Sequence, residues 1–171
     1  MKSLIVYFSR KGENYYNGGI KFLKKGNTEI VAETIQKITN SDIFEIETIK
    51  PYSDNYHECI VEAKNELNNK ERPALKKYID SIDQYDKIFV GYPNWWGTAP
   101  MAVFTFLEHY DLSGKILIPF CTNEGSGMGD SEKDLQNEFK NVEFKKGLSI
   151  QGSKSSELRS VIERWVKKSL E

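Results

Sequence analysis

The chain has 171 residues, of which 39% are hydrophobic and 29% are charged, and a chain of this size can bury about 70% of its unfolded surface. Its 24 Lys and Arg residues nearly balance 25 Asp and Glu residues, for a formal net charge of -1 at pH 7. This balance argues against a basic nucleic-acid surface and an acidic tail. We predict a single domain that spans residues 1–171.

The sequence also lacks the patterns of membrane and metal proteins. No apolar run approaches the ~20 residues that a transmembrane helix needs, and the segment MKSLIVYFS has no cleavage site of the A-x-A type. Cys59 and Cys121 match no CxxC or metal-finger spacing, which is typical of reduced thiols. We expect a cytoplasmic protein with no metal, no membrane partner and no nucleic-acid partner.

Short apolar runs alternate with longer amphipathic segments along the chain. The runs predict five strands, at residues 3–8, 43–48, 87–92, 115–120 and 146–150. The other segments predict helices at residues 28–38, 56–67, 99–110, 131–139 and 156–170. This alternation predicts an α/β fold with a doubly wound, five-stranded parallel sheet in the order 2-1-3-4-5 and helices on both faces.

The loop after the first predicted strand has the composition of a phosphate site. Ser9 and Arg10 follow the strand, and Gly26, Asn27 and Thr28 open the next helix. Hydroxyl and amide donors at a helix N-terminus favour an oxyanion, although Asn27 or Thr28 would also serve as a plain helix cap. The segment is neither GxGxxG nor a Walker loop, so one monophosphate fits it better than a dinucleotide or a triphosphate.

Residues 12–25 interrupt this loop and are too numerous for a simple strand-to-helix turn. We expect an inserted flap that lays Tyr15 or Tyr16 over a ligand. The alternative is a surface loop with its apolar side chains packed beneath it.

The loop after the third predicted strand carries two adjacent tryptophans in GYPNWWGTAP, residues 91–100. Turns normally take small polar residues, so two large rings at the carboxyl end of a sheet indicate a flat ligand. The alternative is that Trp95 and Trp96 only cap the core. The loop after the fourth strand, CTNEGSGMG, is either a flexible connection or a glycine-rich surface that presents backbone groups to a ring edge. Together the three loops predict a mononucleotide with a planar tricyclic ring.

The first strand with its Ser and later GNT, the YPNWWGTAP turn and the CTNEGSGMG loop resemble the flavodoxin family, in particular members with a paired-Trp third loop. The resemblance covers essentially the whole chain, with an insertion in the phosphate loop. It implies bound FMN. The cofactor-binding residues that it implies are Ser9, Arg10, Asn27 and Thr28 for the phosphate, Pro93, Asn94, Trp95, Trp96 and Gly97 beside the ring, and Thr122, Glu124, Gly125, Ser126 and Gly127 in the second ring loop.

Three functions are compatible with this site. The first is an electron carrier, although a net charge of -1 is unlike the strongly acidic docking surface of such carriers. The second is an NAD(P)H-dependent quinone or flavin reductase, and the third is a non-catalytic FMN-binding module. The partner is a redox protein or a small-molecule acceptor. We assign no catalytic residue, and we expect His57 and His109 to be surface or packing histidines.

Overall fold

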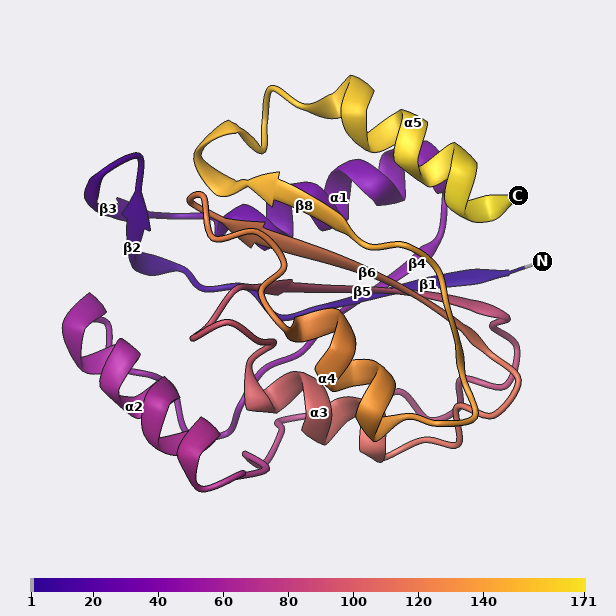
Figure 1. Cartoon of the computed structure of the whole chain (residues 1–171), viewed down its shortest axis with the longest axis horizontal. Helices are drawn as coiled ribbons and strands as arrows, with labels where there is room; N and C mark the ends of the chain where they lie inside the picture. Colours follow the sequence, from indigo (N-terminus) through magenta and orange to yellow (C-terminus); the bar gives the residue numbers. More distant parts are fainter. Residues whose placement is uncertain (1) are drawn as a thin grey trace.

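The computed structural model describes residues 2–171, and a parallel β-sheet runs through the middle of the molecule (Figure 1). The strands of this sheet are β1 (Ser3–Tyr7), β4 (Asp42–Glu45), β5 (Lys87–Pro93), β6 (Ile116–Asn123), β7 (Glu143–Phe144) and β8 (Leu148–Gln151). Their order is β4-β1-β5-β6-β7, and β8 also pairs with β6. All of these pairings are parallel. The predicted order 2-1-3-4-5 is therefore confirmed, with the fifth position divided between β7 and β8.

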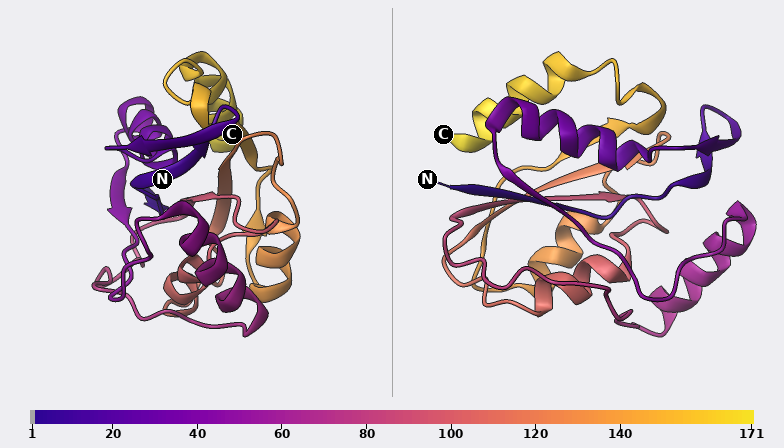
Figure 2. Two further views of the ribbon diagram at one scale, coloured as in Figure 1. Left: turned by 90° about the vertical axis from the view of Figure 1, so that its left-hand side faces the viewer. Right: turned by 180° about the vertical axis from the view of Figure 1, so that it is seen from behind.

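Helices cover both faces of the sheet, as Figures 1 and 2 show. They are α1 (Asn27–Thr39), α2 (Tyr56–Asn68), α3 (Met101–Glu108), α4 (Ser131–Glu138) and α5 (Arg159–Leu170), with a short 3-10 helix at Gly152–Lys154. α1 and α5 pack on one face, and α3 and α4 pack on the other. Among residues 2–171, no helix has both the length and the apolar character that crossing a membrane requires.

Side chains of the central strands alternate between two cores. Along β1, Ile5 and Tyr7 pack under α1 and α5, whereas Leu4 and Val6 pack over α3 and α4. Because helices cover both faces, the central strands need apolar residues at almost every position. The sequences of β1, β5 and β6 are accordingly near-continuous apolar runs.

A β-hairpin extends from the carboxyl end of β1, where we expected a flap. β2 (Gly12–Tyr16) and β3 (Gly19–Leu23) pair in antiparallel fashion. Asn17 and Gly18 connect them with positive φ angles of 48° and 88°, as a two-residue type I′ turn requires. The alternative of apolar side chains packed beneath the insertion is wrong for most of it, since Phe22 is 67% exposed.

The helix α2 lies at the carboxyl edge of the sheet, at the same end of the molecule as the hairpin (Figures 1 and 2). It packs against β2 and α3, and its buried residues are Cys59 and Ala63. The hairpin and α2 are therefore two walls at the end of the sheet where the predicted site lies.

Arg10 and Glu13 tie the hairpin to α2. The Arg10 guanidinium donates to the backbone oxygens of Glu13 at 2.8 Å, Ser53 at 2.8 Å and Asp54 at 3.1 Å. In turn, the Glu13 carboxylate accepts a 2.7 Å hydrogen bond from the backbone N–H of Tyr56, the first residue of α2. The positive end of the helix dipole also stabilises a negative carboxylate at the helix N-terminus. We call these contacts the Arg10–Glu13 clamp.

Gly91 tests how closely β5 and β6 pack. A Cβ at this position would overlap the ring of Phe120, its register partner on β6. We expect Gly91→Ala to lower the free energy of unfolding by about 1–3 kcal/mol, as overpacking in a core does, measured by urea denaturation. Gly19→Ala is the control, because a Cβ there has no neighbour within 4 Å. Equal stability of the two variants would contradict the close packing.

Arg10→Lys tests the clamp, because lysine keeps the charge but has no planar fork of donors. We expect the local opening energy of the hairpin and of the first turn of α2 to fall by roughly 1–3 kcal/mol. Hydrogen exchange should then accelerate at residues 12–23 and 56–59 and stay unchanged in β5 and β6. Lys11→Ala, at the adjacent exposed cation, should change neither region. Unchanged exchange in Arg10→Lys would argue against the clamp.

Candidate functional site

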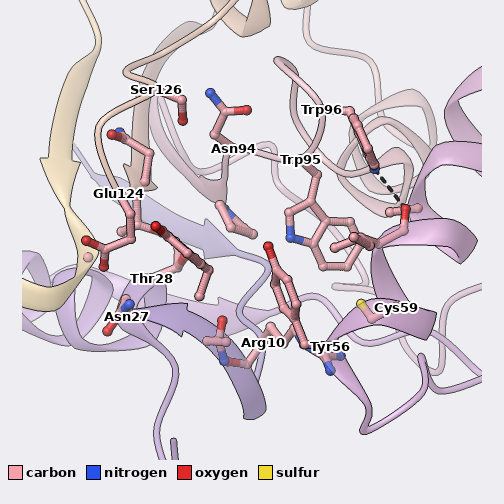
Figure 3. A pocket seen from close by; sticks show the side chains of 18 of the residues that line it. Arg10, Asn27, Thr28, Tyr56, Cys59, Asn94, Trp95, Trp96, Glu124 and Ser126 are labelled. Carbon is pink, nitrogen blue, oxygen red and sulfur yellow. Dashed lines mark hydrogen bonds between the residues drawn. The ribbon is translucent and has the colours of Figure 1, made fainter. Parts of the chain in front are cut away.

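A cavity of about 450 Å³ opens at the carboxyl ends of the central strands. Its walls come from the N-terminus of α1, the loops after β5 and β6, the hairpin and α2 (Figure 3). Eleven of the fourteen predicted site residues line it, namely Arg10, Asn27, Thr28, Pro93, Asn94, Trp95, Trp96, Gly97, Thr122, Glu124 and Ser126. The other three, Ser9, Gly125 and Gly127, are not among the residues that line it, so their predicted contact with a ligand remains a prediction.

The N-terminus of α1 forms one end of the cavity. Its N-cap residue, Gly26, has no side chain to cap the helix, and the Ser9 hydroxyl accepts a 3.1 Å hydrogen bond from the Glu29 N–H in its place. The backbone N–H groups of Asn27 and Thr28 have no hydrogen-bond partner within residues 2–171, as is usual for the first turn of a helix. These two amides and the helix dipole form a site for an anion.

Two close contacts fix this end of the cavity. The hydroxyls of Thr28 and Thr122 are 2.7 Å apart and buried, and they join the start of α1 to the end of β6. The Asn27 side chain lies so close to Gly152 that a Cβ on Gly152 would overlap it. Gly152 is a cavity residue that our sequence reasoning missed, and its role is to leave room for Asn27.

The loops after β5 and β6 are hydrogen-bonded to each other. The Asn94 side chain donates to the Gly127 carbonyl at 2.9 Å and accepts from the Gly97 N–H at 2.8 Å. The side-chain oxygen of Asn123 accepts hydrogen bonds from the backbone N–H groups of Gly125 and Gly127, each at 3.0 Å. The two glycine amides are thus used within the loop. Asn123, which lines the cavity, is a second residue that the sequence reasoning missed.

The two tryptophans have different environments. Trp95 is half-buried in the cavity wall, and its ring makes edge contacts with Phe8 at 5.1 Å and Tyr52 at 4.9 Å. Trp96 is 49% exposed, and its indole N–H donates to the Ile60 carbonyl of α2 at 2.8 Å. Its φ of 57° is uncommon for a bulky residue. Trp95 therefore packs on the core and also faces the cavity, whereas Trp96 connects the loop to α2.

The charged side chains of the cavity wall are held by protein groups. Arg10, which we expected at a phosphate, is part of the clamp to α2. The Glu124 carboxylate accepts hydrogen bonds from the backbone N–H and the hydroxyl of Ser153, at 2.7 and 2.8 Å. Figure 3 shows Glu124 beside Asn27 and Thr28, on the side of the cavity opposite Trp95 and Cys59.

One face of α2 supplies the wall that the sequence reasoning missed. Tyr56, Cys59, Ile60 and Ala63 line the cavity, and their spacing is the ordinary helical repeat of an apolar face. Such a face predicts burial, but it does not distinguish packing on a sheet from lining a cavity. Burial raises the pKa of the Cys59 thiol to about 11, so the thiol stays uncharged at neutral pH.

The remaining reactive side chains play no part in this wall. His57 is exposed on α2, and the ring of His109 stacks on Tyr78 at 4.0 Å. Both cysteines are free thiols. Across residues 2–171, no group of three His, Cys, Asp or Glu side chains could hold a metal ion.

This arrangement suits a ligand with one anionic end and one uncharged planar end. The open amides of α1 can bind the anion. Trp95 and the Asn94 side of the cavity offer aromatic and amide contacts, and Arg10 and Glu124 are already hydrogen-bonded to protein groups. The donor set fits a monophosphate better than a group with several charges, because the cation in the wall, Arg10, is engaged elsewhere.

Several solved structures share this fold. A presumed flavoprotein from Bacteroides eggerthii is 28% identical, with 99% of this chain and 98% of that chain covered and a TM-score of 0.78. A presumed flavoprotein from Bacteroides uniformis is 29% identical, with 97% of each chain covered and a TM-score of 0.77. A Lactobacillus acidophilus flavoprotein in complex with FMN shares the fold at 19% identity, with 91% of this chain and 97% of that chain covered and a TM-score of 0.65.

Comparison at the level of sequence gives the family. No curated protein matches the chain. A family model described as Flavodoxin matches residues 20–169, which include the N-terminus of α1, α2 and the loops after β5 and β6. The chain therefore belongs to the flavodoxin family.

Proposed function

We propose that this protein binds FMN non-covalently and carries electrons through it. One observation carries the proposal: a single cavity at the carboxyl ends of β1, β5 and β6 combines two open helix amides with an aromatic wall. This is the place where doubly wound sheets bind ligands. The FMN in the Lactobacillus acidophilus flavoprotein, which shares the fold, supports the choice of cofactor.

The residues of the cavity divide the work of binding. The amides of Asn27 and Thr28 would hold the phosphate, with Ser9 and Thr122 keeping the start of α1 in place. Trp95 and Asn94 would hold the planar ring. When bound, FMN supplies the redox chemistry by taking up and releasing electrons. The protein's part is to orient the ring, exclude water and position the hydroxyls and amides around it.

A second candidate is a reductase that transfers electrons from NAD(P)H to a small quinone or flavin. The wall formed by the hairpin and α2 favours this role over exchange with a charged protein partner. That wall covers the cavity with uncharged residues, among them Tyr15, Tyr56 and Ile60. We propose no separate role as a non-catalytic FMN module, because no feature of the cavity favours it.

FMN binding is tested by titrating the purified apoprotein with FMN and following the quenching of flavin fluorescence. We expect one FMN per chain. Riboflavin, which lacks the phosphate, should bind about 10- to 100-fold more weakly, because it loses the charge-assisted hydrogen bonds to α1. A protein that takes up no FMN would overturn the proposed function. Equal affinity for the two flavins would remove only the phosphate site at α1.

The roles of the tryptophans are tested by Trp95→Ala and Trp96→Ala. Contact between an aromatic side chain and a base-like ring contributes ~1–3 kcal/mol. We therefore expect Trp95→Ala to weaken FMN binding by about tenfold or more. The effect of Trp96→Ala should be smaller, because this ring is half-exposed and docked on α2. If both variants kept full FMN affinity in the same titration, the stacking role would be wrong.

A further inference from the structure

Part of the cavity wall has no role in the FMN binding proposed above. This part consists of Tyr15 on the hairpin and Tyr56, Cys59, Ile60 and Ala63 on α2. We call it the hairpin–α2 wall. It faces the same cavity as the proposed flavin residues but comes from elements outside the three loops of the sheet.

The hairpin–α2 wall carries no charge at neutral pH. Burial raises the pKa of the Cys59 thiol to about 11 and also raises the pKa of the Tyr56 phenol. The Arg10 guanidinium beside them donates hydrogen bonds to three backbone oxygens.

Two hydroxyls in the wall have no protein partner. The hydroxyls of Tyr16, Tyr52, Tyr85, Tyr92 and Tyr110 all donate hydrogen bonds. In contrast, no hydrogen bond from within residues 2–171 reaches the hydroxyl of Tyr15 or Tyr56, although both residues line the cavity. The two phenols are also near each other, since Tyr15 contributes to the raised pKa of Tyr56. They are free to donate hydrogen bonds to a ligand.

The positions of these phenols are fixed by the Arg10–Glu13 clamp. Glu13 precedes Tyr15 by two residues on β2, and its carboxylate binds the backbone N–H of Tyr56 itself. Asn14, which lies between Glu13 and Tyr15, donates hydrogen bonds to the backbone oxygens of Arg10 and Gly12. The wall is thus held by hydrogen bonds on both elements. Because Tyr15 is 46% exposed, this part of the cavity is also open to a compound arriving from solvent.

We propose that the hairpin–α2 wall is an acceptor subsite beside FMN, for a small, planar, uncharged compound with two carbonyl oxygens, of the quinone class. The proposal rests on the proposed function, because FMN must supply the electrons. The hydroxyls of Tyr15 and Tyr56 donate hydrogen bonds to the carbonyl oxygens, and Ile60, Cys59 and Ala63 contact the apolar ring. The phenols position the acceptor and are not consumed.

The reaction balances without any other group of the protein. Fully reduced FMN passes two electrons and two protons to the quinone, and each quinone oxygen gains one hydrogen. The products are the hydroquinone and oxidised FMN. An external reductant of the NAD(P)H or dithionite class regenerates reduced FMN.

The experiment uses the FMN-loaded protein, reduced without oxygen by one equivalent of dithionite. The reduced protein is mixed with menadione in a stopped-flow instrument, and the return of the oxidised flavin absorbance is followed. We expect the rate to saturate with menadione concentration. Tyr15→Phe and Tyr56→Phe should each raise the half-saturating concentration by about threefold to tenfold, the cost of one hydrogen bond.

The control variant is Tyr78→Phe, which removes a phenol hydroxyl from a ring packed against His109 outside the cavity. It should leave the menadione dependence unchanged. FMN affinity, measured separately by fluorescence, should be the same in all variants. Failure to bind FMN would overturn the proposed function itself. With normal FMN binding, a rate linear in menadione or an unchanged rate in the Tyr15→Phe, Tyr56→Phe double variant would overturn the subsite. Weaker FMN binding when the phenols are removed would also overturn it, because the phenols would then contact the flavin itself.

Discussion

Parallel pairing of β1 with β5, and of β5 with β6, brings three loops out of the sheet at one edge. The register aligns Tyr7 with Gly91 and Pro93 with Thr122, so the chain leaves each strand at nearly the same level. Every feature of the cavity depends on this. The open amides of α1 follow the first strand, Asn94 and Trp95 follow β5, and the loop that Asn94 holds in place follows β6. A hairpin-connected sheet would distribute these groups over two edges.

Several residues expected to bind ligand already have hydrogen-bond partners within the protein. Ser9 caps α1, Arg10 binds three carbonyl oxygens, and the amides of Gly125 and Gly127 bind Asn123. The reason is general: loops at a cavity leave backbone groups without secondary-structure partners, and a nearby polar side chain stabilises them first. Within residues 2–171, the amides of Asn27 and Thr28 at the start of α1 have no such partner and stay available to a ligand.

The cavity wall has little net charge. Arg10 and Glu124 give the cavity wall one positive and one negative charge, and the chain as a whole has a net charge of -1. A carrier that exchanges electrons with charged proteins gains speed from a strongly charged docking surface. This protein instead places apolar and phenolic side chains of the hairpin and α2 around its cavity. Its physical chemistry favours small uncharged compounds at that wall.

By itself, the sequence determined the α/β class, the strand order and eleven residues of the cavity wall. It could do so because strands covered on both faces must be apolar throughout, and because loops after parallel strands meet at one edge. The Asn-Gly pair at residues 17 and 18 is a hairpin signal that our sequence reasoning missed, because the strands beside it are too polar and exposed to show a core-facing pattern. Only the tertiary structure decided that Tyr56, Cys59, Ile60 and Ala63 line the cavity, and that Arg10 holds the segment before α2 by hydrogen bonds to its carbonyl oxygens. Helical periodicity identifies an apolar face without identifying what covers it, and an arginine's partners depend on distant carbonyls that no local pattern encodes.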